Sequence, residues 1–116
     1  MTLSISPLKD VKQTKRTLQI RQQRRRKAWR IARTAAALLK SKYHATRVVV
    51  FGSLTDKERF SLWSDLDLAV WGVTPGDYFD AVAKVLDIGG EIKTDLILAE
   101  KCKPPLREVI ETGKEI

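Results

Sequence analysis

Two stretches of the chain place aspartates where strand-forming residues surround them. Asp65 and Asp67 lie two positions apart at the start of the apolar run 66–71. In an extended strand this spacing puts both side chains on one face, about 6.6 Å apart along the strand. Asp95 lies in the middle of another apolar run, 92–98, where an isolated carboxylate is costly to bury. These residues are therefore the first candidates for chemistry.

If the two runs form neighbouring strands with their acidic faces aligned, all three carboxylates converge on one point. The 65–70 segment carries no lysine or arginine to neutralise them. Converging hard oxygen ligands are what Mg²⁺ prefers, so this pattern predicts a magnesium site. The alternative is that Asp65 is a turn residue and Asp95 an edge residue facing water, and the spacing leaves both interpretations open.

A Gly-Ser pair follows the β-branched run Arg47–Phe51. Gly52 allows the backbone to approach a phosphate closely, and Ser53 adds a hydroxyl and an N–H, although most such pairs are ordinary turns. Lys57 and Arg59 lie in the polar loop that follows, where they could contact a triphosphate or simply be solvated.

The elements that must position these residues follow from periodicity and from turn residues. The sequence predicts an α/β (α+β) fold, in which helices flank a small mixed sheet of three to four strands and a long basic helix comes first. Trp29 and Trp71 are expected to pack between that first helix and the sheet. The predicted helices are 8–42, a helix from Thr74-Pro75 to Gly89-Gly90 and a short one at about 106–111, and the predicted strands are 47–51, 66–71 and 92–98.

Composition narrows the class of protein. The 116 residues are 43% hydrophobic and 31% charged, which fits one globular domain. No apolar run approaches the roughly 20 residues needed to cross a membrane, and no secretory signal is readable, so a cytoplasmic protein is expected. The single cysteine, Cys102, cannot form an internal disulfide, which fits a reducing compartment.

Charge is divided sharply along the chain. Residues 1–50 hold 14 basic residues and one acidic residue, whereas residues 51–116 hold eight basic and 13 acidic residues. A basic arm can bind a polyanion or an acidic protein surface. The run Arg24–Lys27 is therefore either a nucleic-acid patch or a solvated helix face.

Taken together, the segments Val49–Ser53 and Ser64–Leu68 and the later Asp95 resemble the minimal nucleotidyltransferase (MNT) domains of the DNA polymerase β superfamily. The resemblance covers residues 24–116 and implies a nucleotidyltransferase fold there. Residues 1–23 are then a basic N-terminal helical extension.

The resemblance also implies roles for individual residues. Gly52 and Ser53 would hold the triphosphate of ATP, with Lys57 and Arg59 as further phosphate contacts. Asp65, Asp67 and Asp95 would bind two Mg²⁺ ions, and Asp95 would also help to activate the attacking hydroxyl.

Small MNT proteins of this type are antitoxins of helical HEPN ribonuclease toxins, and some transfer AMP from ATP to the toxin. The resemblance therefore implies protein adenylylation (AMPylation) of a HEPN partner. His44 lacks the arginine four to six residues earlier that a HEPN ribonuclease requires, so this chain is expected to be the MNT half alone. Two alternatives stay open: a non-catalytic antitoxin that neutralises its toxin by complex formation, and a regulator that binds nucleic acid through the basic helix.

Overall fold

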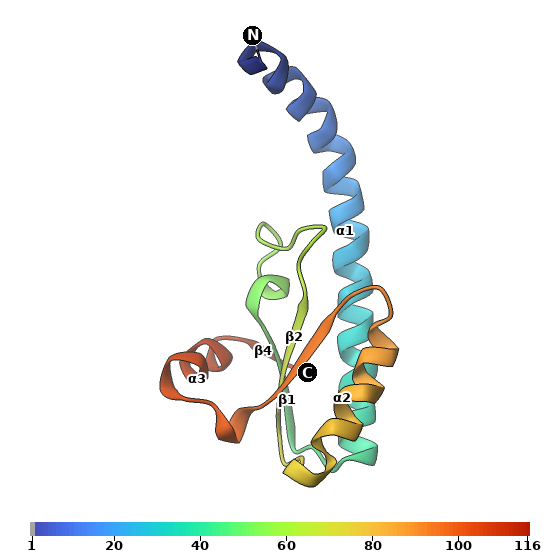
Figure 1. Cartoon of the computed structure of the whole chain (residues 1–116), viewed down its shortest axis with the longest axis vertical. Coiled ribbons are helices and arrows are strands. Elements are labelled where there is room, and N and C mark those ends of the chain that lie inside the picture. Colours follow the sequence, from blue (N-terminus) through green and yellow to red (C-terminus); the bar gives the residue numbers. More distant parts are fainter. Residues whose placement is uncertain (1) are drawn as a thin grey trace.

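The computed structural model describes the backbone of residues 2–116 and the side chains of residues 15–116. One four-stranded sheet lies between two unequal layers of helices (Figure 1). The elements are α1 (Thr2–Lys42), β1 (Arg47–Phe51), the 3-10 helix η1 (Gly52–Thr55), β2 (Leu66–Trp71), α2 (Pro75–Gly89), β3 (Thr94–Leu98), the 3-10 helix η2 (Ala99–Lys101), α3 (Pro104–Glu111) and β4 (Lys114–Glu115).

The strand order is β3-β2-β1-β4, and the sheet is mixed. β1 pairs antiparallel with β2 and with β4, whereas β2 and β3 run parallel. Parallel neighbours need a crossover, and α2 supplies it between β2 and β3. The predicted α/β class and mixed sheet are confirmed, with four strands.

Side-chain alternation divides the sheet into two faces. The even-numbered strand residues, among them Val48, Val50, Leu68 and Val70, are buried in the larger core against α1 and α2. The odd-numbered residues face the opposite side, where η2 and the eight-residue α3 provide the cover (Figure 1). This second face is therefore covered over only part of its length, which leaves room for polar side chains at one end.

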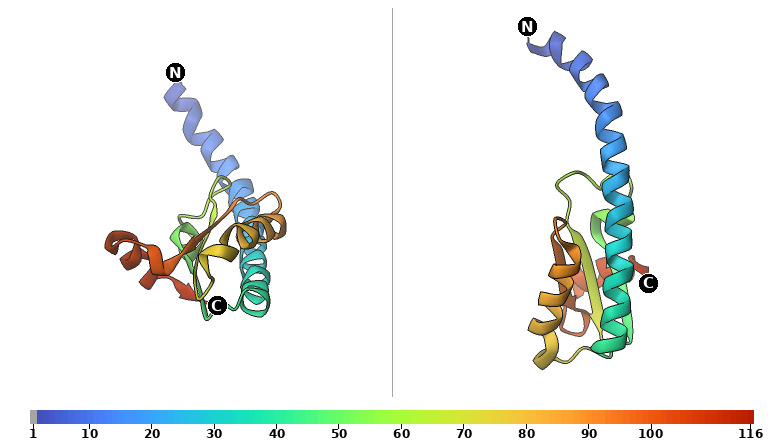
Figure 2. Two further views of the ribbon diagram at one scale, coloured as in Figure 1. Left: turned by 60° about the horizontal axis from the view of Figure 1, so that its bottom comes forward. Right: turned by 90° about the vertical axis from the view of Figure 1, so that its right-hand side faces the viewer.

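The C-terminal half of α1 packs on the sheet because its inward positions are small or aliphatic. Ala28, Ala32 and Ala35 are fully buried, and so is Leu39 one turn later. Alanines at helical spacing let the helix axis come close to the sheet. The other half of α1 extends beyond the sheet, as both views in Figure 2 show.

Several predicted boundaries change. The first helix begins at Thr2 rather than at residue 8, the third strand at Thr94 rather than 92, and the last helix at Pro104 rather than about 106. Thr74 takes the N-cap position of α2, but its side chain makes no capping hydrogen bond. The side chains of residues 1–14 lie outside the described part, so the structure does not address their packing.

Trp71 was expected between the first helix and the sheet, and this prediction is wrong. Trp29 does pack against the α1 side of the core, but Trp71 packs with the cluster on the opposite face. The reason is the strand register, because Trp71 is an odd-numbered residue of β2 and projects to the α3 side.

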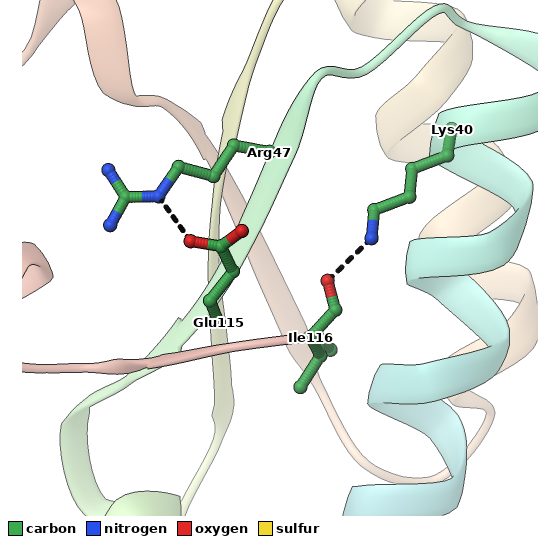
Figure 3. Close-up of polar contacts among 4 residues, drawn as sticks. All are labelled: Lys40, Arg47, Glu115 and Ile116. Atoms are coloured by element: carbon green, nitrogen blue, oxygen red, sulfur yellow. Dashed lines mark hydrogen bonds and ion pairs between the residues drawn. The ribbon is translucent and has the colours of Figure 1, made fainter.

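The C-terminal end of the chain closes the sheet beside β1. Arg47 Nε donates a hydrogen bond of 2.8 Å to Glu115 Oε1, and Lys40 Nζ donates one of 2.6 Å to the Ile116 carbonyl (Figure 3). The Ile116 N–H adds a bond of 2.9 Å to the Val48 carbonyl. β4 thus links the sheet edge to α1.

Over the residues that are described, no helix combines the length and the apolar character that a membrane crossing would require.

The tight approach of Gly113 to β1 gives a test of this fold. A methyl group at Gly113 would lie 2.6 Å from Val49 Cγ1 and would also collide with the Val50 carbonyl. We expect Gly113→Ala to lower the free energy of unfolding by about 1–3 kcal/mol in urea titrations.

Gly76→Ala is the matched control, because a methyl group there would meet only Thr74 Oγ1 at 3.9 Å. It should change the stability by less than about 1 kcal/mol. Equal effects of the two substitutions would contradict the β4 packing.

Candidate active site

A row of directly paired residues crosses the sheet at one end. Phe51 of β1 is paired with Asp67 of β2, and Asp67 is paired with Asp95 of β3. Paired residues project from the same face of a sheet, so Asp67 and Asp95 stand side by side on the α3 face. The alignment of acidic faces that the sequence left open is therefore present.

Asp65 joins this face because it lies two residues before Asp67. Its neighbours on the chain hold it there: the Leu66 N–H bonds the Lys93 carbonyl at 2.9 Å, and the Ser64 carbonyl accepts a bond of 3.0 Å from Arg24 Nη2. Ser64 Oγ also accepts a bond from the Ser61 N–H. The backbone on both sides of Asp65 is thus fixed.

Gly52 lies directly against the Asp67 carboxylate. A methyl group at Gly52 would be 2.5 Å from Asp67 Oδ2, and the backbone there has φ = +76°, a region that non-glycine residues rarely adopt. Both facts require glycine. The bend into η1 therefore brings the Gly52 backbone against the carboxylate, where the Cβ of any other residue would collide with Asp67 Oδ2.

The surroundings of Asp67 shift the pKa of its carboxyl group. Burial, followed by repulsion from Asp95 and from Asp65, raises the pKa of Asp67 from 3.8 to about 6, while Lys93 opposes the rise. Both other carboxylates are therefore near enough to act on Asp67. A divalent cation placed among them would relieve this repulsion.

Lys93 is a nearby cation that the sequence reasoning missed. Its Nζ lies 4.0 Å from Asp95 Oδ1, and both side chains are largely exposed. Lys93 precedes Asp95 by two residues, so strand alternation places both on one face. That spacing was the signal that could have identified it.

The side chains do not form a closed metal cage. Among residues 15–116, no three histidine, cysteine, aspartate or glutamate side chains are placed to hold a metal ion together. Mg²⁺ commonly binds through one or two carboxylates, with substrate phosphates and water supplying the remaining ligands. The donor set therefore fits an ion that arrives with a phosphorylated substrate.

Ser53 is partly buried in η1, next to Gly52, while Lys57 and Arg59 are exposed in the loop that follows. Lys57 lines a pocket against α1 together with Arg21. The structure therefore brings Gly52 to the carboxylates and leaves the contacts of Lys57 and Arg59 with a substrate as predictions.

Two arginines of α1 hold this loop, a role that no local pattern in the sequence indicated. Arg21 donates to the carbonyls of Phe60, Lys57 and Glu58 at 3.0–3.2 Å. The Arg24 guanidinium lies 6.0 Å from the centre of the buried Phe60 ring. Within the run Arg24–Lys27, Arg24 is thus a structural anchor rather than part of a solvated face.

No protein-family model matches this sequence, and no curated protein matches it either. Several solved structures do match this chain. One of them, described as a "putative minimal nucleotidyltransferase", aligns with a TM-score of 0.57 and 27% sequence identity over 85% of this chain and 93% of the other. The chain therefore has a nucleotidyltransferase fold of the minimal type.

The raised pKa of Asp67 predicts a pH-dependent stability. Between about pH 4 and pH 6 the folded protein keeps a proton on Asp67 that the unfolded chain has lost, so the free energy of unfolding falls as pH rises through this window. The Asp67→Asn substitution removes this fall in the free energy of unfolding, because asparagine does not ionise. At pH 7 we expect this variant to be more stable than the original protein by roughly 1 kcal/mol, allowing for solvent screening.

Urea unfolding at pH 4 and pH 7 measures the effect. Asp87→Asn, on the exposed side of α2, is the control and should leave the difference between the two pH values unchanged. If the stability that Asp67→Asn gains over the original protein is no larger at pH 7 than at pH 4, neither burial nor repulsion raises the pKa of Asp67 in solution.

Proposed function

We propose that the protein is a Mg²⁺-dependent nucleotidyltransferase that transfers AMP from ATP to a partner protein in the cytoplasm. The observation that supports this most is the direct pairing of Asp67 with Asp95 beside Gly52, with Asp65 near enough to repel Asp67, on a fold of the nucleotidyltransferase type. Repelling carboxylates next to a tight glycine bend suit a cation and a phosphate group better than they suit packing.

In this proposal each residue has a defined task. Asp65, Asp67 and Asp95 would hold two Mg²⁺ ions, which would supply charge neutralisation at the phosphates and at the attacking and leaving oxygens. Gly52 and Ser53 place backbone N–H groups and a hydroxyl against the triphosphate.

The reaction is an in-line displacement at the α-phosphorus. The acceptor hydroxyl forms a new O–P bond, the bond to the β-phosphate oxygen breaks, and pyrophosphate leaves. Asp95, which is partly exposed beside Lys93, is placed to take up the hydroxyl proton. Lys57 and Arg59, from the loop between Gly52 and Asp65, are proposed to bind phosphate oxygens.

A protein acceptor is supported by apolar side chains that the chain leaves uncovered. Phe79 on α2 is 80% exposed, and Trp63, directly before Ser64-Asp65, is 88% exposed. Large apolar side chains at the surface are characteristic of binding sites. Following the resemblance to MNT proteins, we propose that the partner is a HEPN-domain toxin and that this chain is its antitoxin.

One observation favours a second candidate function. Because no three of the described carboxylate, histidine and cysteine side chains are placed to hold a metal ion, the chain could instead be a non-catalytic antitoxin that acts by complex formation. In that case the acids would be dispensable for neutralising the toxin.

Labelling of the partner protein distinguishes the catalytic function from the non-catalytic one. With [α-³²P]ATP and Mg²⁺, we expect transfer of label to the co-expressed partner, and chelation of Mg²⁺ should abolish it. Asp65→Asn combined with Asp67→Asn should lower the labelling rate by at least about a hundredfold, because positioning and charge stabilisation supply most of the catalysis.

Asp77→Asn combined with Asp87→Asn is the matched control, since it removes the same charge from exposed positions of α2. Undiminished labelling by the Asp65/Asp67 variant would refute the site. Absence of labelling together with full neutralisation of the toxin by that variant would establish the non-catalytic alternative.

A further inference from the structure

Two adjoining pockets follow one side of α1. The first, of about 540 Å³, lies between α1 and the loop at Lys57, and the second, of about 480 Å³, lies between α1 and Lys114 of β4. Both are lined by Arg25, Arg26 and Trp29, so they adjoin one another along the helix. We call the two pockets together the α1 groove.

The α1 groove is strongly cationic. Arg25, Arg26, Arg30 and Arg33 line it from the helix, while Lys57 and Lys114 contribute from the other elements. Glu58 is the acidic residue among those lining it. The charge continues beyond the groove, because residues 15–42 contain eleven lysines and arginines and no aspartate or glutamate.

The described part of the chain does not neutralise this charge. Its ion pairs are Lys27 with Glu91, Arg47 with Glu115 and Lys93 with Asp95, and none of them involves a cation of the α1 groove. Among the described side chains, the Nε–H groups of Arg24 and Arg25 are buried without a protein acceptor, and of the two only Arg25 lines the α1 groove.

Trp29 organises the cations. The Arg33 guanidinium lies 5.4 Å and Lys114 Nζ 5.5 Å from the centre of its ring, which is partly buried against the core. Cation–π contacts of this kind hold positive groups in place without cancelling their charge. The α1 groove is thus a set of positioned cations rather than a spread of freely moving side chains.

We propose that the α1 groove binds the phosphodiester backbone of a single-stranded nucleic acid. The arginines from Arg25 to Arg33 span about 12 Å along the helix, which is enough for consecutive phosphates of one strand. Guanidinium groups match phosphate oxygens with paired hydrogen bonds. A flexible single strand can follow a recess between a helix and a loop, whereas a stiff duplex cannot.

An acidic protein segment fits the α1 groove less well. The centre of a protein interface normally holds several apolar anchors, and here Leu18 and Trp29 are the apolar residues among a majority of cations. The most exposed apolar side chains, Trp63 and Phe79, lie elsewhere. Lys57 lines the α1 groove and is also a proposed phosphate contact of the active site, but the arginines of the groove have no part in that site, so this inference does not depend on the function proposed above.

The test is fluorescence anisotropy with a labelled oligouridylate of about 12 nucleotides, within the site sizes of single-strand binders. We expect binding whose affinity falls steeply with salt. In the variant Arg26→Gln, Arg30→Gln, Arg33→Gln, all at exposed positions, the affinity should fall at least about tenfold, and the slope of log K against log[salt] should decrease by about 2, since each contact contributes about 0.7.

Lys42→Gln, Lys84→Gln, Lys103→Gln is the matched control, because it removes three charges from exposed positions outside the α1 groove. This control should bind the oligouridylate with nearly the affinity of the original protein. The double variant Asp65→Asn, Asp67→Asn should do the same. Circular dichroism and urea unfolding establish that each variant is folded.

Three outcomes would overturn the proposal: no binding at low salt, an equal loss in the control variant, or displacement of the oligouridylate by a polyglutamate peptide of equal charge. The last result would assign the groove to an acidic protein partner.

Discussion

The parallel pairing of β2 with β3, which sets Asp67 directly beside Asp95, is the constraint on which the site depends. A sheet fixes the spacing of paired side chains, so the two carboxylates cannot move far apart while the strands stay paired. Asp65 adds a third charge that repels Asp67, and the Gly52 backbone lies directly against the Asp67 carboxylate. The arrangement is electrostatically unfavourable in isolation, and the fold is stabilised by the apolar core on the other face of the sheet.

α1 connects this core to the site. Its alanines pack under the sheet, while Arg21 and Arg24, one to two turns earlier, bond the loop that ends at Asp65. The α1 groove is lined from the same helix by Arg25, Arg26, Arg30 and Arg33. One helix therefore contributes to stability, to the position of a candidate metal ligand and to a cationic surface.

The sequence predicted what depends on local pattern. The strands that carry Asp67 and Asp95 were recognisable from their apolar runs, and Asp65 and Asp67 share a face because the strand period is two. The sequence did not predict contacts that depend on tertiary geometry. The hydrogen bonds from Arg21 and Arg24 to the loop join residues about 40 positions apart, and no periodicity encodes them. Trp71 was placed on the wrong face because its direction follows from strand register, which an apolar run does not reveal.

The most direct test of the central claim is an NMR titration of the Asp67 side-chain carboxyl carbon, with and without Mg²⁺ and a non-hydrolysable ATP analogue. If the three carboxylates form a cation site, the midpoint without Mg²⁺ lies at about 6 and falls when Mg²⁺ and the nucleotide are added, because a bound cation favours the ionised form. A midpoint near 4 that neither addition changes would contradict the account, because Asp67 would then be an ordinary surface carboxylate.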